Sequence, residues 1–269
     1  MTSTSSAFTH LLGPVIDIAR RAGARILEVY ESGEFAVANK ADSSPLTQAD
    51  LRAHQTIVEA LHALTPDWPV LSEESASIDF AERAHWSRYW LVDPLDGTRE
   101  FLSRNGEFTV NIALIDGHEP VLGVVYAPAK RLLYYAVPGA GAYRALADEP
   151  ARPIVVKRYA NSPIRIVGSR SHRGDSLDGL LSRLGSYELI AIGSSLKLCM
   201  VAEGSADLYP RLGATSEWDT AAAHAVVLAA GGYVTSTTGT TLTYNSRPEL
   251  RNPHFLVYAD CDRDWHRLL

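Results

Sequence analysis

Apolar residues recur three or four positions apart over two stretches near the start of the chain, the spacing of one face of a helix. The first stretch, residues 8–31, carries Leu11, Leu12, Val15, Ile16, Ala19, Ala22, Ile26, Leu27 and Tyr30. The second carries Leu51, Ile57, Val58, Leu61 and Leu64. Before it, the polar stretch K-A-D-S-S-P-L-T-Q-A-D predicts a loop, and its Thr47 and Asp50 have the spacing of a helix cap. The pattern predicts two helices, and the second ends before Pro66.

Short apolar runs replace the helical spacing in the next part of the chain. They predict strands at 69–72, 88–93, 108–115, 120–127 and 131–137. Asp116-Gly117 is typical of a hairpin turn, so we expect the two strands around it to pair antiparallel.

A segment rich in proline and charge, residues 147–163, follows these strands. Beyond it, strand-like 164–169 and 187–192 alternate with helical patterns at 175–184, 195–204 and 217–230. Such alternation is typical of α/β layering. We therefore predict an N-terminal α+β half, residues 1–155, and a C-terminal α/β half, residues 156–269.

Composition and charge narrow the class of protein. The 269 residues are 46% hydrophobic and can form a packed core. The formal net charge of −6 argues against binding a nucleic acid polymer but allows a small anionic ligand. The two cysteines, Cys199 and Cys261, suggest neither a disulfide framework nor a zinc site. The first ten residues do not have the pattern of a signal peptide, and no run of 18 apolar residues occurs. We expect a cytoplasmic protein without a transmembrane segment.

Carboxylates lie at the ends of several predicted elements: Asp50, Glu73, Glu74, Asp93, Asp96 and Asp219. Taken singly, most have a plain structural explanation as a helix cap or a solvated loop residue. The pair in D-P-L-D-G is different, because Pro94 fixes its φ angle and Gly97 permits a tight turn. Both carboxylates can then point beyond the strand end. Mg²⁺ takes carboxylate oxygens of this kind together with substrate phosphate and water, so the sequence predicts a metal site. Solvated acids or a structural calcium site are the alternatives.

Several motifs resemble a known family. V-L-S-E-E-S, W-L-V-D-P-L-D-G-T-R-E-F and E-W-D-T-A-A resemble the inositol monophosphatase superfamily of magnesium-dependent, lithium-sensitive phosphatases. R-N-G-E-F-T-V-N-I-A-L-I-D, S-R-S-H and G-S-S-L-K-L-C-M-V-A-E-G-S-A-D-L-Y-P-R are similar to its bacterial CysQ-type 3′(2′),5′-bisphosphate nucleotidases in particular. The resemblance covers residues 10 to about 258. It implies an α/β protein with the layered αβαβα sugar-phosphatase fold.

The resemblance also implies roles for individual residues. The metal ligands for two or three Mg²⁺ ions would be Glu73, Asp93, the Leu95 carbonyl, Asp96 and Asp219. Asp50 and Thr98 would orient and deprotonate the attacking water, with Glu74 behind them. The substrate would contact Glu73, Leu95, Asp96, Gly97, Thr98, His172, Ser194, Lys197, Arg211 and Asp219.

A second phosphate would require cations beyond the metal site. G-S-S-L-K places Ser194 and Lys197 at the start of a predicted helix, where backbone N–H groups favour an anion. By resemblance these two residues, Arg211 and His172 would bind the 5′-phosphate and the adenosine. Without the resemblance, the two cations could equally be solvated surface charges, and His172 an ordinary loop residue.

The resemblance implies hydrolysis of 3′-phosphoadenosine 5′-phosphate to AMP and phosphate in sulfate assimilation, with 3′-phosphoadenosine 5′-phosphosulfate as a further candidate substrate. A phosphatase for inositol phosphates or fructose bisphosphate would keep the same metal ligands. A metal- or phosphate-binding sensor without turnover is the alternative outside enzymes, although it would not need Asp50 and Thr98. The sequence leaves open the oligomeric state and peripheral contact with the cytoplasmic face of the inner membrane.

Overall fold

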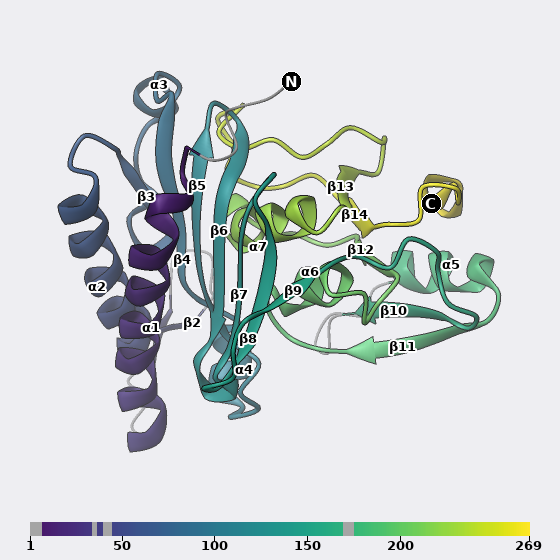
Figure 1. The fold of residues 1–269 in the computed structure, drawn as a ribbon, viewed down its shortest axis with the longest axis horizontal. Helices are drawn as coiled ribbons and strands as arrows, with labels where there is room; N and C mark the ends of the chain where they lie inside the picture. Colours follow the sequence, from purple (N-terminus) through teal and green to yellow (C-terminus); the bar gives the residue numbers. More distant parts are fainter. Residues whose placement is uncertain (1–6, 34–36, 40–44, 169–174) are drawn as a thin grey trace.

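The chain folds into alternating layers of helices and sheets (Figure 1). The structure, a computed structural model, describes residues 7–33, 37–39, 45–168 and 175–269. Helices α1 (Thr9–Ser32) and α2 (Gln48–Leu64) pack against each other and on one face of a seven-stranded sheet. Helix α7 (Glu217–Ala229) packs on its other face, beside α6 (Leu196–Ala202). A five-stranded sheet and α5 (Asp175–Leu184) complete the predicted αβαβα order.

The seven-stranded sheet has the strand order β3-β4-β5-β6-β7-β8-β9. Its first two strands are parallel and all later pairs are antiparallel. The strands are β3 (Val70–Ser72), β4 (Arg88–Asp96), β5 (Thr109–Asp116), β6 (Glu119–Ala127), β7 (Leu132–Val137), β8 (Gly141–Leu146) and β9 (Arg152–Ile154). Short helical elements between them are η1 (Glu73–Ser75), α3 (Phe80–Arg83), α4 (Thr98–Leu102) and η2 (Pro128–Lys130).

The central strands are buried on both faces, which explains their nearly continuous apolar sequences. In β5, Ile112 and Leu114 pack in the core under α1 and α2, whereas Ala113 and Ile115 pack in the core that contains α6 and α7. Alternate side chains of a strand point to opposite faces, so one strand contributes to both cores. Helix α7 lies so close to β6 that a Cβ on Gly123 would stand 2.1 Å from the Ala222 carbonyl oxygen.

The second sheet has the order β11-β10-β12-β14-β13. Its strands are β10 (Ile164–Gly168), β11 (Tyr187–Ala191), β12 (Leu208–Arg211), β13 (Tyr233–Ser236) and β14 (Phe255–Tyr258). A third apolar core, which includes Ile166, Leu208 and Trp265, lies between this sheet, α5 and the terminal helix η3 (Trp265–Leu268).

Most of the predicted elements are confirmed within a few residues, including both N-terminal helices and the hairpin at Asp116-Gly117. Several details differ, and strands β12, β13 and β14 of the second sheet were not predicted from the sequence. Leu51 is 40% exposed, so it does not belong to the apolar face of α2. The predicted loop before α2 contains β2 (Pro45–Thr47), which pairs with β1 (Val37–Asn39). Strand β4 continues through the D-P-L-D motif instead of ending at its first aspartate. The chain between 138 and 163 contains β8 and β9, which the sequence pattern did not predict.

The two sheets divide the chain between Ile154 and Ile164, close to the predicted boundary of the two halves at residues 155 and 156. One apolar core nevertheless combines residues of both sheets, such as Leu91 and Val257. The division into separate units at residue 155 therefore stays a prediction. Within the described ranges, no helix has the length and apolar character needed to cross a membrane.

Candidate active site

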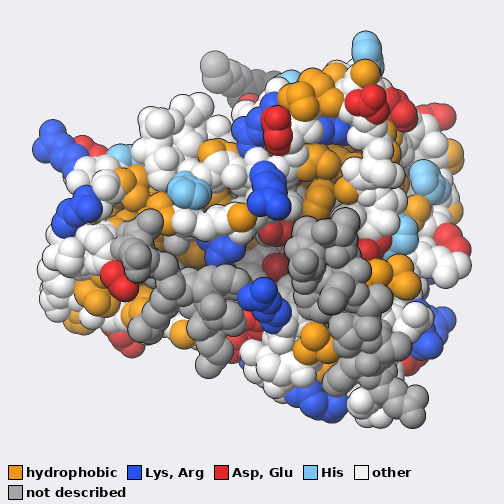
Figure 2. Space-filling model, turned by 180° about the vertical axis from the view of Figure 1, so that it is seen from behind, with side chains coloured by type: hydrophobic (Ala, Val, Ile, Leu, Met, Phe, Trp, Pro, Cys, Tyr) orange, Lys and Arg blue, Asp and Glu red, His pale blue; other side chains and the backbone are white. Residues whose placement is uncertain are grey.

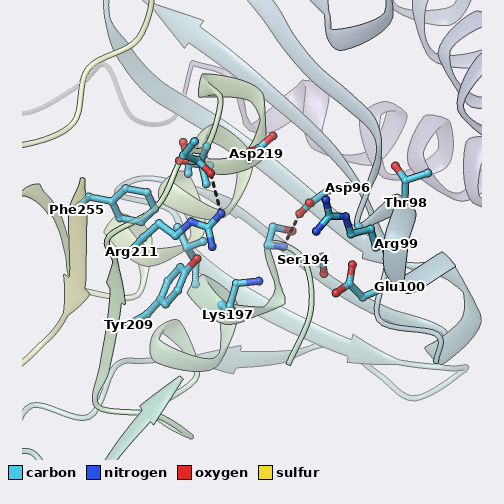
Figure 3. A pocket seen from close by; sticks show the side chains of 16 residues that line it. Asp96, Thr98, Arg99, Glu100, Ser194, Lys197, Tyr209, Arg211, Asp219 and Phe255 are labelled. Atoms are coloured by element: carbon cyan, nitrogen blue, oxygen red, sulfur yellow. Dashed lines mark hydrogen bonds between the residues drawn. The ribbon is translucent and has the colours of Figure 1, made fainter. Parts of the chain in front are cut away.

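A pocket of about 300 Å³ lies where β4, α4, α6, β12 and α7 meet. It brings together many of the predicted site residues: Asp96, Gly97, Thr98, Ser194, Lys197, Arg211 and Asp219. In the close-up, Arg211 approaches from one side and Asp96 and Thr98 from the other (Figure 3). The space-filling view shows acidic side chains deep in a hollow near the centre of one face, with basic side chains around it (Figure 2). The pocket therefore offers both signs of charge to one ligand.

The D-P-L-D motif is held by its strand and by the turn that follows. The Leu95 N–H donates to Asp93 Oδ1 at 3.0 Å, which fixes the first carboxylate beside the backbone. Gly97 has φ +90°, a left-handed conformation that glycine adopts without a Cβ clash. This turn directs the chain into α4, so that Thr98 becomes its first residue beside Asp96 in the pocket wall.

Asp219 reaches the same pocket from the first turn of α7. Its Oδ2 accepts from the Ser216 N–H at 2.9 Å in a capping box, which confirms the predicted helix start. The cap fixes the carboxylate against the helix end. Asp219 thus approaches the carboxylates of β4 from a different layer of the fold.

The acidic side chains raise one another's pKa values. Burial, and then the charges of Glu73, Asp96 and Asp219, raise the pKa of Asp93 well above its usual range. Removal from bulk water also raises the pKa of Asp219, to about 8, and the Asp96 charge adds to this shift. Carboxylates in this arrangement repel one another and would be stabilised by cations. Hard oxygen donors with excess negative charge are suitable ligands for Mg²⁺.

The predicted metal ligands do not form a ready-made cluster. In the described part of the chain, no three His, Cys, Asp or Glu side chains converge closely enough to hold an ion. Glu73 and Glu74 lie in η1 at the end of β3 and are half-buried. Their roles, and that of the Leu95 carbonyl, therefore stay predictions that the donor chemistry supports.

Asp50 has the predicted structural role. Its Oδ2 accepts from the Thr47 N–H at 2.8 Å and from the Thr47 hydroxyl at 2.6 Å, in a capping box at the start of α2. Strand β2, which leads into this cap, also contacts α4, the helix that Thr98 begins. The helices that carry Asp50 and Thr98 thus both contact β2, and the joint action of these two residues on a water stays a prediction.

Lys197 is buried in the pocket wall with 7% exposure, so the alternative of a solvated surface charge is wrong for this residue. Burial lowers its pKa to about 8, while the charge of Asp96 acts in the opposite direction. Arg211 donates from Nη2 to the Ala214 carbonyl at 2.7 Å. Its buried Nε has no hydrogen-bond partner among the residues that the structure describes. A buried donor without a partner is costly, so a ligand acceptor at this point would stabilise it.

One donor of the predicted anion site at the helix start already has a partner in the protein, and the site itself stays a prediction. Helix α6 has seven residues, and the N–H of its N-cap Ser195 donates at 2.5 Å to Asp96 Oδ2. A carboxylate of the protein therefore already occupies this donor. Ser194, in the left-handed region at φ +53°, and Lys197 still line the pocket. The fourth predicted group, His172, lies outside the described residues.

Other pocket residues were not predicted from the sequence. Glu100, Ser195, Tyr209 and Phe255 line the pocket, and each has less than 10% exposure. Glu100 and Ser195 belong to motifs that were recognised, so their position next to predicted site residues could have identified them as pocket residues. Tyr209 also belongs to a recognised motif, and Phe255 lies on strand β14, which pairs with the strand of Tyr209.

The fold agrees with known structures. The crystal structure of CysQ from Bacteroides thetaiotaomicron, described as a bacterial member of the inositol monophosphatase family, aligns with TM-score 0.81 and 43% identity. The alignment covers 96% of this chain and 98% of that one. The extragenic suppressor protein suhB from Bartonella henselae aligns with TM-score 0.78 and 26% identity, over 95% and 96% of the two chains.

A model of the inositol monophosphatase family matches residues 9–259. The chain therefore belongs to the inositol monophosphatase family. Within it, the chain is similar to proteins named 3′(2′),5′-bisphosphate nucleotidase CysQ. The protein of this name from Salmonella typhimurium is 51% identical over 249 residues, which are 92% of this chain and 99% of the relative. That of Escherichia coli K12 is 50% identical over the same shares.

Proposed function

We propose that the protein is a Mg²⁺-dependent phosphatase that removes the 3′-phosphate of 3′-phosphoadenosine 5′-phosphate to give AMP and phosphate. The observation that carries the proposal is one pocket that combines the carboxylates Asp96 and Asp219 with the cations Lys197 and Arg211. The two carboxylates can bind metal ions at the phosphate that is cleaved, and the two cations can bind a second phosphate of the substrate. The names of relatives that are about half identical to this chain support the same activity.

The carboxylate donors fit Mg²⁺, since burial and then mutual repulsion raise their pKa values, and bound cations would stabilise the charged forms. Glu73, Asp93, Asp96, Asp219 and the Leu95 carbonyl would hold two or three ions. Bound Mg²⁺ would acidify an attacking water and offset the negative charge that develops on the phosphate and on the leaving oxygen. The protein's part is to fix the geometry of this acidic wall.

Thr98 and Asp50 would position the attacking water and accept its proton. Thr98 lies in the pocket wall next to Gly97, where its hydroxyl can face a phosphate held at Asp96. A hydroxyl linked to a carboxylate can remove a proton from water, so no covalent intermediate is required. Glu74 would support this pair from the end of β3.

The second phosphate would lie at Lys197 and Arg211, and Ser194 and His172 would complete its binding. The ammonium of Lys197 is largely desolvated, and a charge-assisted bond to phosphate is stronger in such surroundings. An inositol monophosphate or a sugar with one phosphate would leave these cations without a partner. The proposal therefore favours a substrate with two phosphates, and includes 3′-phosphoadenosine 5′-phosphosulfate as a second substrate.

A substrate panel tests this function directly. Phosphate release in Mg²⁺ is measured for 3′-phosphoadenosine 5′-phosphate, its phosphosulfate analogue, 3′-AMP, inositol 1-phosphate and fructose 1,6-bisphosphate. We expect the highest kcat/KM for the adenosine bisphosphate. A higher kcat/KM for an inositol or sugar phosphate would contradict the proposal.

Metal dependence is tested in the same assay. EDTA should abolish turnover, added Mg²⁺ should restore it, and lithium should inhibit it. Full activity after dialysis against EDTA would contradict the assigned metal dependence.

Sulfate assimilation is the process in which this reaction would remove the bisphosphate by-product. We expect the protein to act in the cytoplasm, free or bound peripherally at the inner face of the membrane. Fractionation of cells that express the tagged chain would distinguish these locations.

A further inference from the structure

The metal-ligand strand β4 carries an irregularity at the D-P-L-D motif. Asp93 pairs with Asn111 of β5, and Asp96 pairs with Thr109. The chain therefore advances three residues on β4 but two on β5 between the same pairs. An extra residue of this kind bends a strand and redirects its side chains. The bend must be stabilised by other residues, because the directions of the Asp93 and Asp96 side chains depend on it.

Ser195 contacts both sides of this irregularity from a different layer of the fold. Its hydroxyl lies 2.8 Å from Asn111 Oδ1 and 2.9 Å from Thr109 Oγ1. A serine hydroxyl has one proton, which it donates to the Asn111 carbonyl oxygen, so the Thr109 hydroxyl donates to Ser195. The Ser195 N–H donates to Asp96 Oδ2 at 2.5 Å. One residue thus holds the two β5 partners and one of the aspartates.

These polar groups are shielded from solvent. Ser195 is 2% exposed, Asn111 1% and Thr109 0%. Water cannot reach these atoms to replace a broken hydrogen bond at low cost, so each hydrogen bond constrains the geometry strongly.

The same residue fixes the segment that carries the phosphate-binding cation. Ser195 is the N-cap of α6, and its carbonyl accepts from the Leu198 N–H at 3.0 Å. Lys197 follows two residues later in the pocket wall. Just before Ser195, the Gly193 N–H donates to Glu107 Oε2 at 2.9 Å. The start of α6 is therefore tied to β5 and its approach.

We propose that Ser195 is a positioning residue that couples the metal subsite to the phosphate subsite. Its backbone N–H orients Asp96, its side chain fixes the strand irregularity, and its position at the start of α6 sets where Lys197 lies. This inference rests on the proposed function, because that function assigns metal ions to Asp96 and phosphate to Lys197. It predicts that one hydroxyl group, hydrogen-bonded to Asn111 and Thr109, controls the affinity for both ligands.

The test is Ser195→Ala, with two separate binding measurements by calorimetry. Mg²⁺ is titrated without nucleotide to report on Asp96. AMP is titrated at saturating Mg²⁺ to report on Lys197. Loss of a buried hydrogen bond predicts that both dissociation constants rise about fivefold or more. The control is Ser205→Ala, since Ser205 follows α6 at its other end and its hydroxyl lies 2.7 Å from Glu203 Oε1 and 3.1 Å from the Met200 carbonyl oxygen. We expect it to change neither constant.

Thr109→Val provides a second variant that removes a hydroxyl at nearly constant volume, should Ser195→Ala not fold. It should also weaken the binding of both Mg²⁺ and AMP. The double variant, Ser195→Ala with Thr109→Val, should lose less binding free energy than the two single variants together, because both substitutions break the same contact. Unchanged affinities, or a change for one ligand alone, would overturn the inference. The wild-type substrate panel tests the proposed function independently of these variants.

Discussion

Two carboxylates in the first turn of α7 have opposite surroundings although they are two residues apart. Glu217 points into the protein, where it is fully buried. Asp219 is half-buried and lines the pocket. Burial raises the pKa of both side chains, to about 7 for Glu217 and about 8 for Asp219. The two carboxylates differ in the charged and polar groups around them, which also act on their pKa values.

Glu217 is surrounded by groups that stabilise its charge. Its Oε2 accepts from the Asn245 N–H at 2.8 Å. The buried Arg83 donates in turn to Asn245 Oδ1 at 2.5 Å and to the Pro248 carbonyl. The backbone bond to Asn245 and the positive charges of Arg247 and Arg83 all lower the pKa of Glu217 against the effect of burial. This network links α7 to α3 and to the loop before β14.

Asp219 instead faces other acids. After burial, the strongest influence on its pKa is the charge of Asp96, which raises it further, while the Ser216 N–H and the charge of Arg211 lower it by smaller amounts. The fold thus compensates Glu217 internally but Asp219 only in part, and a bound cation would supply the rest. A buried charge with internal partners serves the fold, whereas a cluster of like charges at a pocket indicates a functional site.

The largest effect should come from removing the pocket carboxylate. Asp219→Asn keeps the volume and can still accept the capping bond, but it is a poor Mg²⁺ ligand. Loss of several kcal/mol of charge stabilisation predicts that kcat/KM falls at least about a hundredfold. The melting temperature should not decrease, because repulsion with Asp96 is relieved.

Glu217→Gln is the matched control, with the same chemical change two residues away. Its kcat/KM should stay close to that of the wild type. Equal losses in the two variants would break the comparison between the two carboxylates.

The next effect concerns stability. Arg83→Met removes the donor to Asn245 and to two backbone carbonyls, those of Arg247 and Pro248. Since the Asn245 acceptor is left buried and two further bonds are lost, we expect the free energy of unfolding to fall by about 3 kcal/mol. Urea denaturation measures the loss, and the folded fraction should keep its kcat/KM. An unchanged urea midpoint would contradict the structural role of this network.

A smaller effect is expected for substrate choice. Lys197→Ala should lower kcat/KM for 3′-phosphoadenosine 5′-phosphate roughly tenfold or more relative to that for 3′-AMP, which has no second phosphate. Lys130→Ala serves as the control, because Lys130 is exposed at the end of η2. If the ratio of the two kcat/KM values were the same in wild type and in Lys197→Ala, Lys197 would not contact the second phosphate.

The smallest effect is a pH dependence of binding. Burial lowers the pKa of Lys197 to about 8, so its ammonium loses the proton as the pH rises from 7 to 9. KM for the bisphosphate should therefore increase over this range, by less than in Lys197→Ala, because bound phosphate favours the charged form. Lys197→Arg should flatten the profile, since arginine stays charged. A rise that persisted unchanged in this variant would assign the titration to another group.

Local features of the sequence predicted much of the fold. The two N-terminal helices follow from apolar spacing, and both capping boxes, Thr47 with Asp50 and Ser216 with Asp219, join residues three positions apart. The D-P-L-D-G turn is also local, since Gly97 supplies the left-handed residue that it needs. Strands β8 and β9 were missed because their short sequences acquire strand structure through pairing with neighbours.

Which acidic residue serves the fold and which serves the pocket was decided by tertiary structure. In the sequence, Glu217 and Asp219 are two acids of one helical turn, and only the resemblance of E-W-D-T-A-A to the family separates them. The Asn245 contact to Glu217 spans 28 positions, and the Ser195 contact to Asp96 spans 99. From the sequence, Lys197 could likewise have been a solvated surface charge, and only the packing of the folded chain shows that it is buried. Sequence spacing determines contacts within a turn or a helix, but burial and partners across layers depend on packing of the whole chain, and these set the charge balance of the site.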